Sequence, residues 1–130
     1  MSAFKSPIIK IGKSSEDIFN ILSDLRNLKD IMPKEVAEFE ATEETCSFKM
    51  PGIPKLTLTT SEKNAYTNIS FIAQDSPVAF VLNCYIKELN IESSEVYLEL
   101  DVELNMMMRV MLEKPLTNLL NGLSEKLKKI

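Results

Sequence analysis

Apolar and polar residues alternate with a period of two over most of the chain between Glu35 and Leu104. In the clearest segment, Val96–Leu104, valine and leucine hold the even positions, while tyrosine, glutamate and aspartate hold the odd ones. One apolar and one polar face are typical of an antiparallel sheet that is covered on a single side. With the turn residues between them, the alternating segments predict about six to seven strands. They are Phe4–Ile11, Ala37–Ala41, Cys46–Met50, Leu56–Thr60, Ile69–Ala73, Val78–Ile86 and Val96–Leu104.

Two short helices are predicted between the first and second strands. Apolar residues recur at steps of one and three within Ser14–Leu22, and a serine at the start of this segment can cap a helix. Asp24 can cap a second helix within Leu25–Ile31, which Pro33 brings to an end. The chain therefore inserts two helices before the remaining strands follow one another.

The segment Met106–Ile130 predicts one long amphipathic helix, since its apolar residues recur at steps of three and four. Pro115 removes a backbone donor inside this helix, so we expect a kink near Met111–Pro115. The kink would separate a methionine-rich first part from a leucine-rich second part. Because methionine side chains adapt to irregular space, we expect ligand contact in Met107–Leu112 and tight structural packing in Leu116–Ile130.

The composition is that of a globular protein, with 45% hydrophobic and 26% charged residues, and 130 residues predict a single domain spanning 1–130. Acidic residues (19) outnumber basic ones (15), and the net charge of −4 offers no footprint for nucleic acid. No apolar stretch is as long as a membrane span and no signal-peptide core is visible, so we expect a cytoplasmic protein without integral membrane association.

The chain contains no histidine, which excludes histidine-based acid–base catalysis and Ser-His or Cys-His nucleophile pairs, and most zinc sites. No cofactor and no metal site is predicted. Cys46 and Cys84 lie within apolar alternation, where buried free thiols are expected rather than a disulfide. Without a histidine to activate it, Cys84 is not expected to act as a nucleophile.

The order of elements resembles the helix-grip fold of the START/Bet v 1-like (SRPBCC) superfamily, and the resemblance covers the whole chain. It depends on Ser15–Leu22 after the first strand, on Leu104-Asn105 before the last helix, and on Glu113–Leu120 within it. The superfamily includes polyketide cyclases, lipid-transfer domains and pollen-allergen-type carriers. The resemblance implies an α+β fold in which a curved antiparallel sheet is wrapped around the long C-terminal helix. It also implies an apolar ligand between the concave face of the sheet and that helix.

The predicted ligand contacts come from the apolar face of the strands and from the methionine-rich part of the last helix. Thr60 or Arg109 would orient the ligand, although an ordinary surface residue is the favoured interpretation of Arg109. The same strand residues could instead fill a solid core, because a core and a pocket wall need the same apolar residues. The predicted contacts are Phe48, Leu58, Thr60, Phe71, Phe80, Leu82, Leu98, Leu100, Val102, Met107, Met108, Arg109, Met111 and Leu112.

Acidic side chains share strand faces at two places, Glu99/Asp101/Glu103 and Glu38/Glu40. Such groups can bind a hard cation or act as an acid–base pair. They all lie on the polar face of the alternation, however, where solvated carboxylates are the ordinary expectation.

Three functional hypotheses follow. The first is a non-enzymatic domain that binds or carries a small hydrophobic molecule, lipid-like or polycyclic. The second is a protein-interaction domain with a filled core that acts through its outer sheet face or its short helices, like the co-chaperone-like relatives in the superfamily. Val81, Tyr85 and Tyr97 on the outer sheet face could support a homodimer, although isolated apolar residues on a surface need no explanation. The protein is expected to be a monomer or a homodimer. The third is a polyketide cyclase-like enzyme, which the missing histidine and the apolar interior disfavour.

Overall fold

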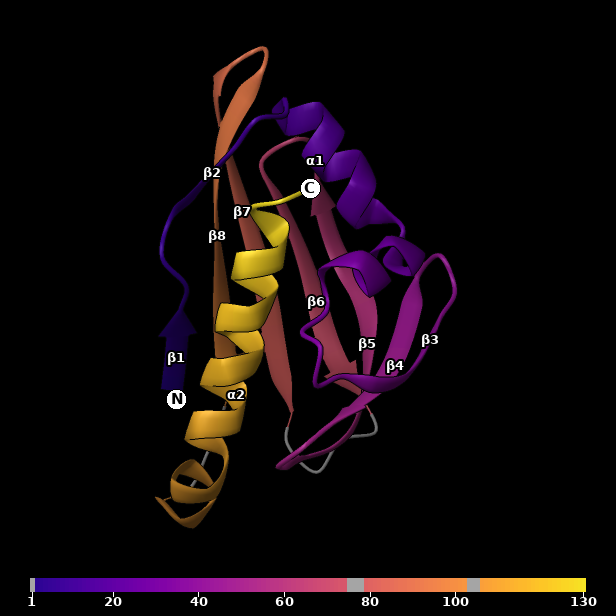
Figure 1. Ribbon diagram of the computed structural model, residues 1–130, viewed down its shortest axis with the longest axis vertical. Coiled ribbons are helices and arrows are strands. Elements are labelled where there is room, and N and C mark those ends of the chain that lie inside the picture. Colours follow the sequence, from indigo (N-terminus) through magenta and orange to yellow (C-terminus); the bar gives the residue numbers. More distant parts are fainter. Residues whose placement is uncertain (1, 75–78, 103–105) are drawn as a thin grey trace.

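The computed structural model describes residues 2–74, 79–102 and 106–130 (Figure 1). Over these residues one antiparallel sheet of eight strands is covered by helices on one face, which confirms the predicted α+β helix-grip arrangement. The strands follow the order β1-β8-β7-β6-β5-β4-β3, and β2 also pairs with β8. The strands are β1 (Ser2–Lys5), β2 (Ile9–Ile11), β3 (Ala37–Ala41), β4 (Thr45–Met50), β5 (Ile53–Asn64), β6 (Asn68–Gln74), β7 (Phe80–Asn90) and β8 (Ser93–Val102). The helices are α1 (Ser15–Ser23), the 3₁₀ helix η1 (Leu25–Ile31) and α2 (Met106–Leu127).

The predicted first strand, Phe4–Ile11, is divided into β1 and β2, which explains why there are more strands than expected. Pro7 has no N–H to donate to a ladder, so regular pairing with β8 is interrupted there. Ser6 keeps the chain bonded to β8 at this point. Its N–H donates to the Leu98 carbonyl (2.9 Å), and its hydroxyl accepts from the Leu98 N–H (2.9 Å). Both halves therefore stay on the same edge of the sheet.

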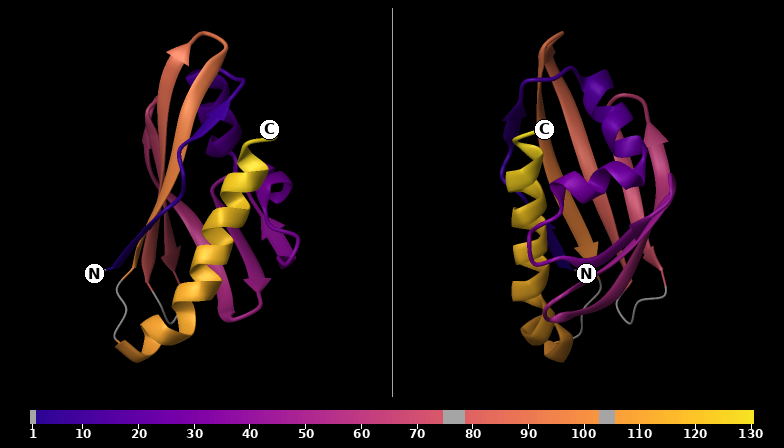
Figure 2. Two further views of the ribbon diagram at one scale, coloured as in Figure 1. Left: turned by 60° about the vertical axis from the view of Figure 1, so that its left-hand side comes forward. Right: turned by 45° about the vertical axis from the view of Figure 1, so that its right-hand side comes forward.

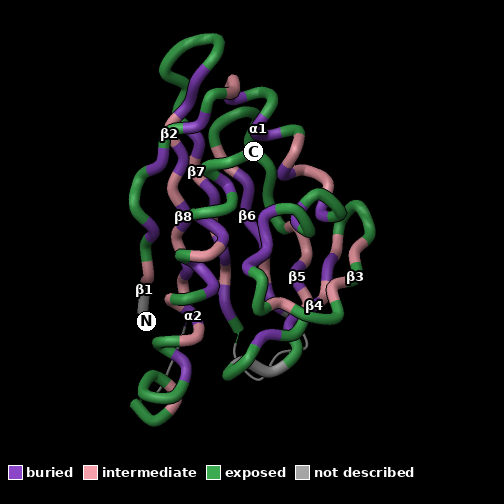
Figure 3. The backbone as a smooth tube through the Cα atoms, in the orientation of Figure 1, coloured by how far each residue is buried: buried purple, intermediate pink, exposed green. Residues whose placement is uncertain are grey.

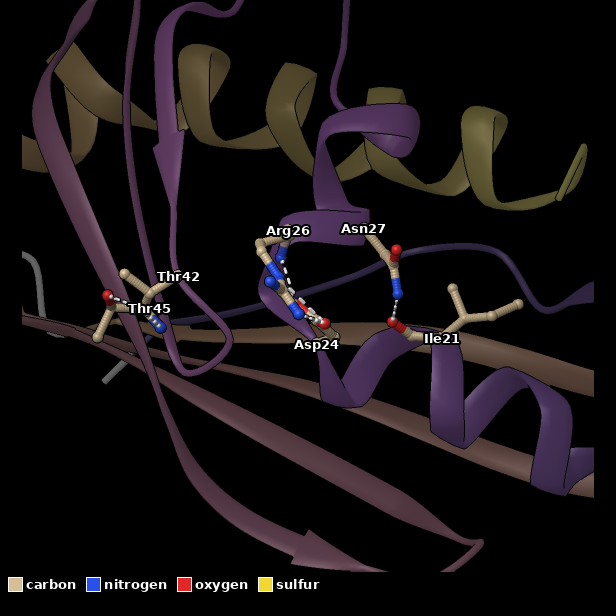
Figure 4. A network of polar contacts seen from close by, with 6 residues as sticks. All are labelled: Ile21, Asp24, Arg26, Asn27, Thr42 and Thr45. Atoms are coloured by element: carbon tan, nitrogen blue, oxygen red, sulfur yellow. Dashed lines mark hydrogen bonds and ion pairs between the residues drawn. The ribbon is translucent and has the colours of Figure 1, made fainter.

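The two short helices begin at the predicted caps. The Asp17 N–H donates to Ser14 Oγ (3.1 Å) at the start of α1, and the Arg26 N–H donates to Asp24 Oδ1 (3.0 Å) at the start of η1. The Arg26 guanidinium also binds the Asp24 carboxylate (2.6 Å), and this hydrogen bond holds the pKa of Asp24 below its usual value. The side-chain amide of Asn27 donates to the Ile21 carbonyl (2.9 Å), which links η1 to α1 (Figure 4).

A 3₁₀ helix has three residues per turn, so side chains three apart lie in one row. In η1 this row is Leu25, Leu28 and Ile31, and all three are buried. Helix α2 contacts η1, β8, β1 and β5, so both η1 and α2 cover the same face of the sheet (Figure 2). Irregularities in strand register, for example between Thr60 and Glu62 in β5, increase the local twist and help the sheet to curve.

Helix α2 is continuous from Met106 to Leu127 with Pro115 inside it, and its first turns bend away from the axis of the rest (Figure 2). Pro115 cannot donate to the carbonyl of Met111, which is the physical reason for the bend. The leucines after the bend are buried on the sheet side, whereas most residues of the first turns are exposed (Figure 3). Among the described residues, none of the helices combines the length and the apolar character that crossing a bilayer requires.

Candidate functional site

A wholly apolar cavity lies between the sheet and the second part of α2, with a volume of about 30 Å³. This volume corresponds to about one or two water molecules, and a cavity without polar partners stays dry. Every side chain of its lining is leucine, isoleucine, methionine, phenylalanine or cysteine. The lining consists of Leu22, Leu28, Ile31, Met32, Phe48, Leu58, Phe71, Phe80, Leu82, Cys84, Leu98, Leu100, Leu116, Leu119, Leu120, Leu123 and Leu127.

The strand residues predicted from alternation meet at this cavity, because alternate side chains of adjacent antiparallel strands project from the same face. The pairings Phe71–Leu82 and Leu82–Leu100 connect β6, β7 and β8 across the cavity wall. The predicted residues found in the lining are Phe48, Leu58, Phe71, Phe80, Leu82, Leu98 and Leu100. Two others lie outside it: Val102 is fully buried elsewhere in the core, and Thr60 has a buried hydroxyl for which the described residues supply no hydrogen-bond partner.

The methionine-rich part of α2 does not reach the cavity. Met107 and Met111 are 74% and 66% exposed, and Arg109 lies 4.0 Å from Glu113 on the helix surface. Met108 and Leu112 pack against the core outside the lining. The part of α2 that faces the cavity is the leucine-rich second part, whose leucines are also buried as expected. The expected ligand contact in Met107–Leu112 stays a prediction.

The helices between β2 and β3 also line the cavity, which the alternation of the strands does not predict. Leu22 of α1, Leu28 and Ile31 of η1, and Met32 after it line the cavity opposite the sheet. The three-residue spacing of Leu25, Leu28 and Ile31 was the available signal, because in a 3₁₀ helix it places all three on one buried row. Cys84 also lines the cavity and was predicted only as a buried thiol.

Among the described residues that line the cavity, Cys84 carries the one ionisable group, a thiol. Burial in apolar surroundings raises the pKa of Cys84 to about 12, and burial likewise raises the pKa of Cys46 to about 12. Neither cysteine forms a disulfide. At neutral pH both thiols are therefore protonated and poor nucleophiles.

The acidic residues on the outer sheet face are paired or solvated. Glu99 contacts Lys5 (3.3 Å), Glu38 contacts Lys49 (3.1 Å), and Asp101 accepts from Asn83 (3.3 Å). Glu103 lies outside the described residues. In residues 2–74, 79–102 and 106–130 no three histidine, cysteine, aspartate or glutamate side chains come together in a way that could hold a metal ion. Elsewhere on this face Tyr85 and Tyr97 stack with ring centroids 4.9 Å apart.

No protein-family model and no curated protein sequence matches the chain. Solved structures do match it. Norcoclaurine synthase from Thalictrum flavum, in complex with dopamine and hydroxybenzaldehyde, aligns with a TM-score of 0.75 at 13% identity over 98% of this chain and 84% of that chain. A START superfamily protein from Mycobacterium smegmatis aligns with a TM-score of 0.70 at 14% identity over 98% and 94%.

The two-domain aromatase/cyclase BexL of the BE-7585A biosynthetic pathway aligns with a TM-score of 0.76 at 13% identity, over 99% of this chain and 46% of that one. These identities are too low to transfer an activity, but the agreement in topology covers nearly the whole chain. The protein therefore has the helix-grip fold of the START/Bet v 1-like superfamily.

Proposed function

We propose that the protein binds or carries a small hydrophobic molecule between the concave face of the sheet and α2. The observation behind this proposal is the cavity lining, in which the sheet, α1, η1 and α2 all present apolar side chains to one space. Such a lining favours an apolar ligand, because a buried polar group without a hydrogen-bond partner costs about 1–3 kcal/mol. We further propose that the protein acts in the cytoplasm, which its two buried free thiols support.

The cavity must widen before it can hold a ligand. Small-molecule sites usually have volumes of about 300–1,000 Å³, compared with about 30 Å³ here. The strands of the sheet are joined by backbone ladders, whereas η1 and α2 are joined to the sheet mainly by side-chain packing. Widening therefore requires η1 and α2 to move apart from the sheet, and the ligand is expected to be slender or small.

Binding rather than catalysis is the proposed role. Of the described lining side chains, none carries a carboxylate, an amine or a hydroxyl. General acid–base chemistry needs such a group within hydrogen-bond reach of the substrate. The Cys84 thiol stays protonated and cannot supply a nucleophile at neutral pH.

A pair of matched leucine variants tests the proposal. Leu116 lines the cavity, whereas Leu112, one helical turn earlier, is buried outside it. Leu116→Ala should enlarge the cavity, so naphthalene and indole should raise the Tm of this variant more than that of the wild type. A ligand at 100 times its Kd contributes about 2.7 kcal/mol, or several degrees in Tm. Leu112→Ala should respond like the wild type.

The small cavity volume favours a second candidate function, a protein-interaction domain with a filled core. Native mass spectrometry of protein purified from cells separates the two functions, because a carrier should retain a hydrophobic molecule. If no apolar compound raises the Tm of the wild type or of Leu116→Ala, ligand binding is rejected. The interaction function would then be the better explanation.

A further inference from the structure

A second and larger hollow opens at the surface where α1, η1 and the end of α2 meet. Its volume is about 450 Å³. Figure 1 shows the C-terminal end of α2 beside α1, and Figure 2 shows the same proximity from another side. The hollow is lined by Lys13, Ile21, Asn27, Asp30, Ile31, Lys126, Lys129 and Ile130.

The lining of this hollow combines positive charge with apolar surface. Lys13, Lys126 and Lys129 outnumber the one acidic side chain, Asp30, although the chain as a whole carries a net charge of −4. The rest of the described lining is Ile21, Ile31, Ile130 and the amide side chain of Asn27. Ammonium groups beside apolar surface are complementary to a molecule that has an anionic end and a hydrocarbon end.

Two hydrogen bonds hold the walls of the hollow in position. The Asn27 side-chain amide donates to the Ile21 carbonyl (2.9 Å), so α1 and η1 are fixed relative to each other (Figure 4). The Ser94 hydroxyl donates to the Lys13 carbonyl (3.0 Å), which attaches the backbone before α1 to β8. Lys13 therefore belongs to a segment that is anchored to the sheet rather than to a free loop.

The hollow and the apolar cavity lie on opposite sides of α1, η1 and the end of α2. Ile31 lines both spaces. At three other places one residue lines the hollow and the next residue in the sequence lines the cavity. These pairs are Ile21/Leu22, Asn27/Leu28 and Lys126/Leu127.

We propose that this hollow is the entrance of the apolar cavity and that it binds the carboxylate or phosphate group of an amphipathic ligand. The hydrocarbon part of the ligand passes Ile31 into the cavity while the lysines hold its anionic group. This inference rests on the proposed hydrophobic-ligand function and specifies the ligand class and its orientation. Ile31 belongs to η1, a short 3₁₀ helix whose hydrogen-bond geometry is poorer than that of an α-helix, so movement of η1 can displace this side chain.

Calorimetric titration with paired probes tests the inference. Decanoate and decanol share a hydrocarbon chain, and only decanoate is anionic. Wild-type protein should bind decanoate at least tenfold more tightly than decanol. Lys13→Gln/Lys126→Gln/Lys129→Gln should abolish this difference while retaining decanol binding. The control Lys34→Gln/Lys55→Gln/Lys114→Gln removes the same charge from exposed lysines outside the hollow and should keep the difference.

Methyl NMR locates the hydrocarbon chain. Decanoate should shift the methyl signals of Ile31, Leu98 and Leu116 together, since they lie along the proposed path and inside the cavity. Shifts confined to Ile21 and Ile130 would show binding in the hollow alone and would overturn the passage into the cavity.

The outcomes separate the inference from the proposed function. Equal wild-type affinities for decanoate and decanol would overturn the lysine entrance and leave hydrophobic-ligand binding intact. Binding of neither probe would overturn both. Inorganic phosphate that binds as tightly as decyl phosphate would show a site for the free anion, which contradicts an amphipathic ligand.

Discussion

At the residue scale, Gly52 holds the β4–β5 turn against α2. Its φ of +84° lies in the region that side chains disfavour, and a Cβ there would come within 2.8 Å of Pro115 Cγ. Gly52→Ala should therefore lower the free energy of unfolding by about 1–3 kcal/mol. Gly12→Ala is the control, because its Cβ would meet nothing within 4 Å, and its stability should be unchanged or slightly higher. Urea unfolding measures both, and equal losses would contradict this account.

The buried thiols give the second prediction at this scale. Burial raises the pKa of Cys46 and of Cys84 from 9.0 to about 12, so the folded state keeps its protons where the unfolded state loses them. This contribution to stability is complete below pH 9 and is lost as the pH rises toward 12. Urea unfolding between pH 8 and pH 10.5 should show a steeper loss for wild type than for Cys46→Ala/Cys84→Ala. The two proteins differ only in the two thiols, so the difference between their pH profiles reports on these groups. Parallel profiles would count against buried neutral thiols.

At the element scale, the two parts of α2 have different energetic roles. Leu120 is 2% exposed and lines the cavity, whereas Met107 is 74% exposed. Leu120→Ala should cost about 2–5 kcal/mol of unfolding free energy, because it removes buried contacts and leaves a cavity. Met107→Ala should change stability by less than about 0.5 kcal/mol. Chemical denaturation of both variants checks this difference, and a large loss in Met107→Ala would place that methionine in the core.

The elements were predictable because each carries its own period. The alternation in Val96–Leu104 predicted a strand with one covered side, and Ser14 and Asp24 predicted the starts of the two short helices. The orientation of the methionines was harder to predict. Extending the leucine stripe back from Leu112 by one turn reaches Met108, which packs against the core, while Met107 and Met111 lie off the stripe and are exposed. Residue type suggested a pocket at this end, but the helical phase decides which side chains face inward.

The position of the cavity also depended on contacts that no local period encodes. Ile31 and Leu127 are 96 residues apart in the sequence and line the same space. Their proximity results from the way η1 and α2 cover one face of the sheet, which only the assembled fold reveals. The strand side of the site could therefore be predicted from alternation, whereas its helical side could not.

At the scale of the whole molecule, the rigid and the movable parts are separate. The eight strands are joined to one another by backbone hydrogen bonds. Helix α2 is not part of these ladders, and η1 is short. Opening free energies are lowest where few backbone hydrogen bonds and few buried contacts must be broken. We therefore expect amides of η1 to exchange with solvent through local opening and amides of β7 and β8 to exchange only through global unfolding.

Hydrogen exchange with and without decanoate tests whether this opening admits the ligand. A ligand that binds only the closed protein at ten times its Kd should slow exchange through an opened state about elevenfold. The slowing should be strongest in η1 and in the last turns of α2, since these surround Ile31 and Leu127. Met106–Met111 should exchange at an unchanged rate, because these residues lie outside both the cavity and the hollow. Protection that begins at Met106–Met111 and leaves η1 unaffected would move the entrance to the methionine end of the helix.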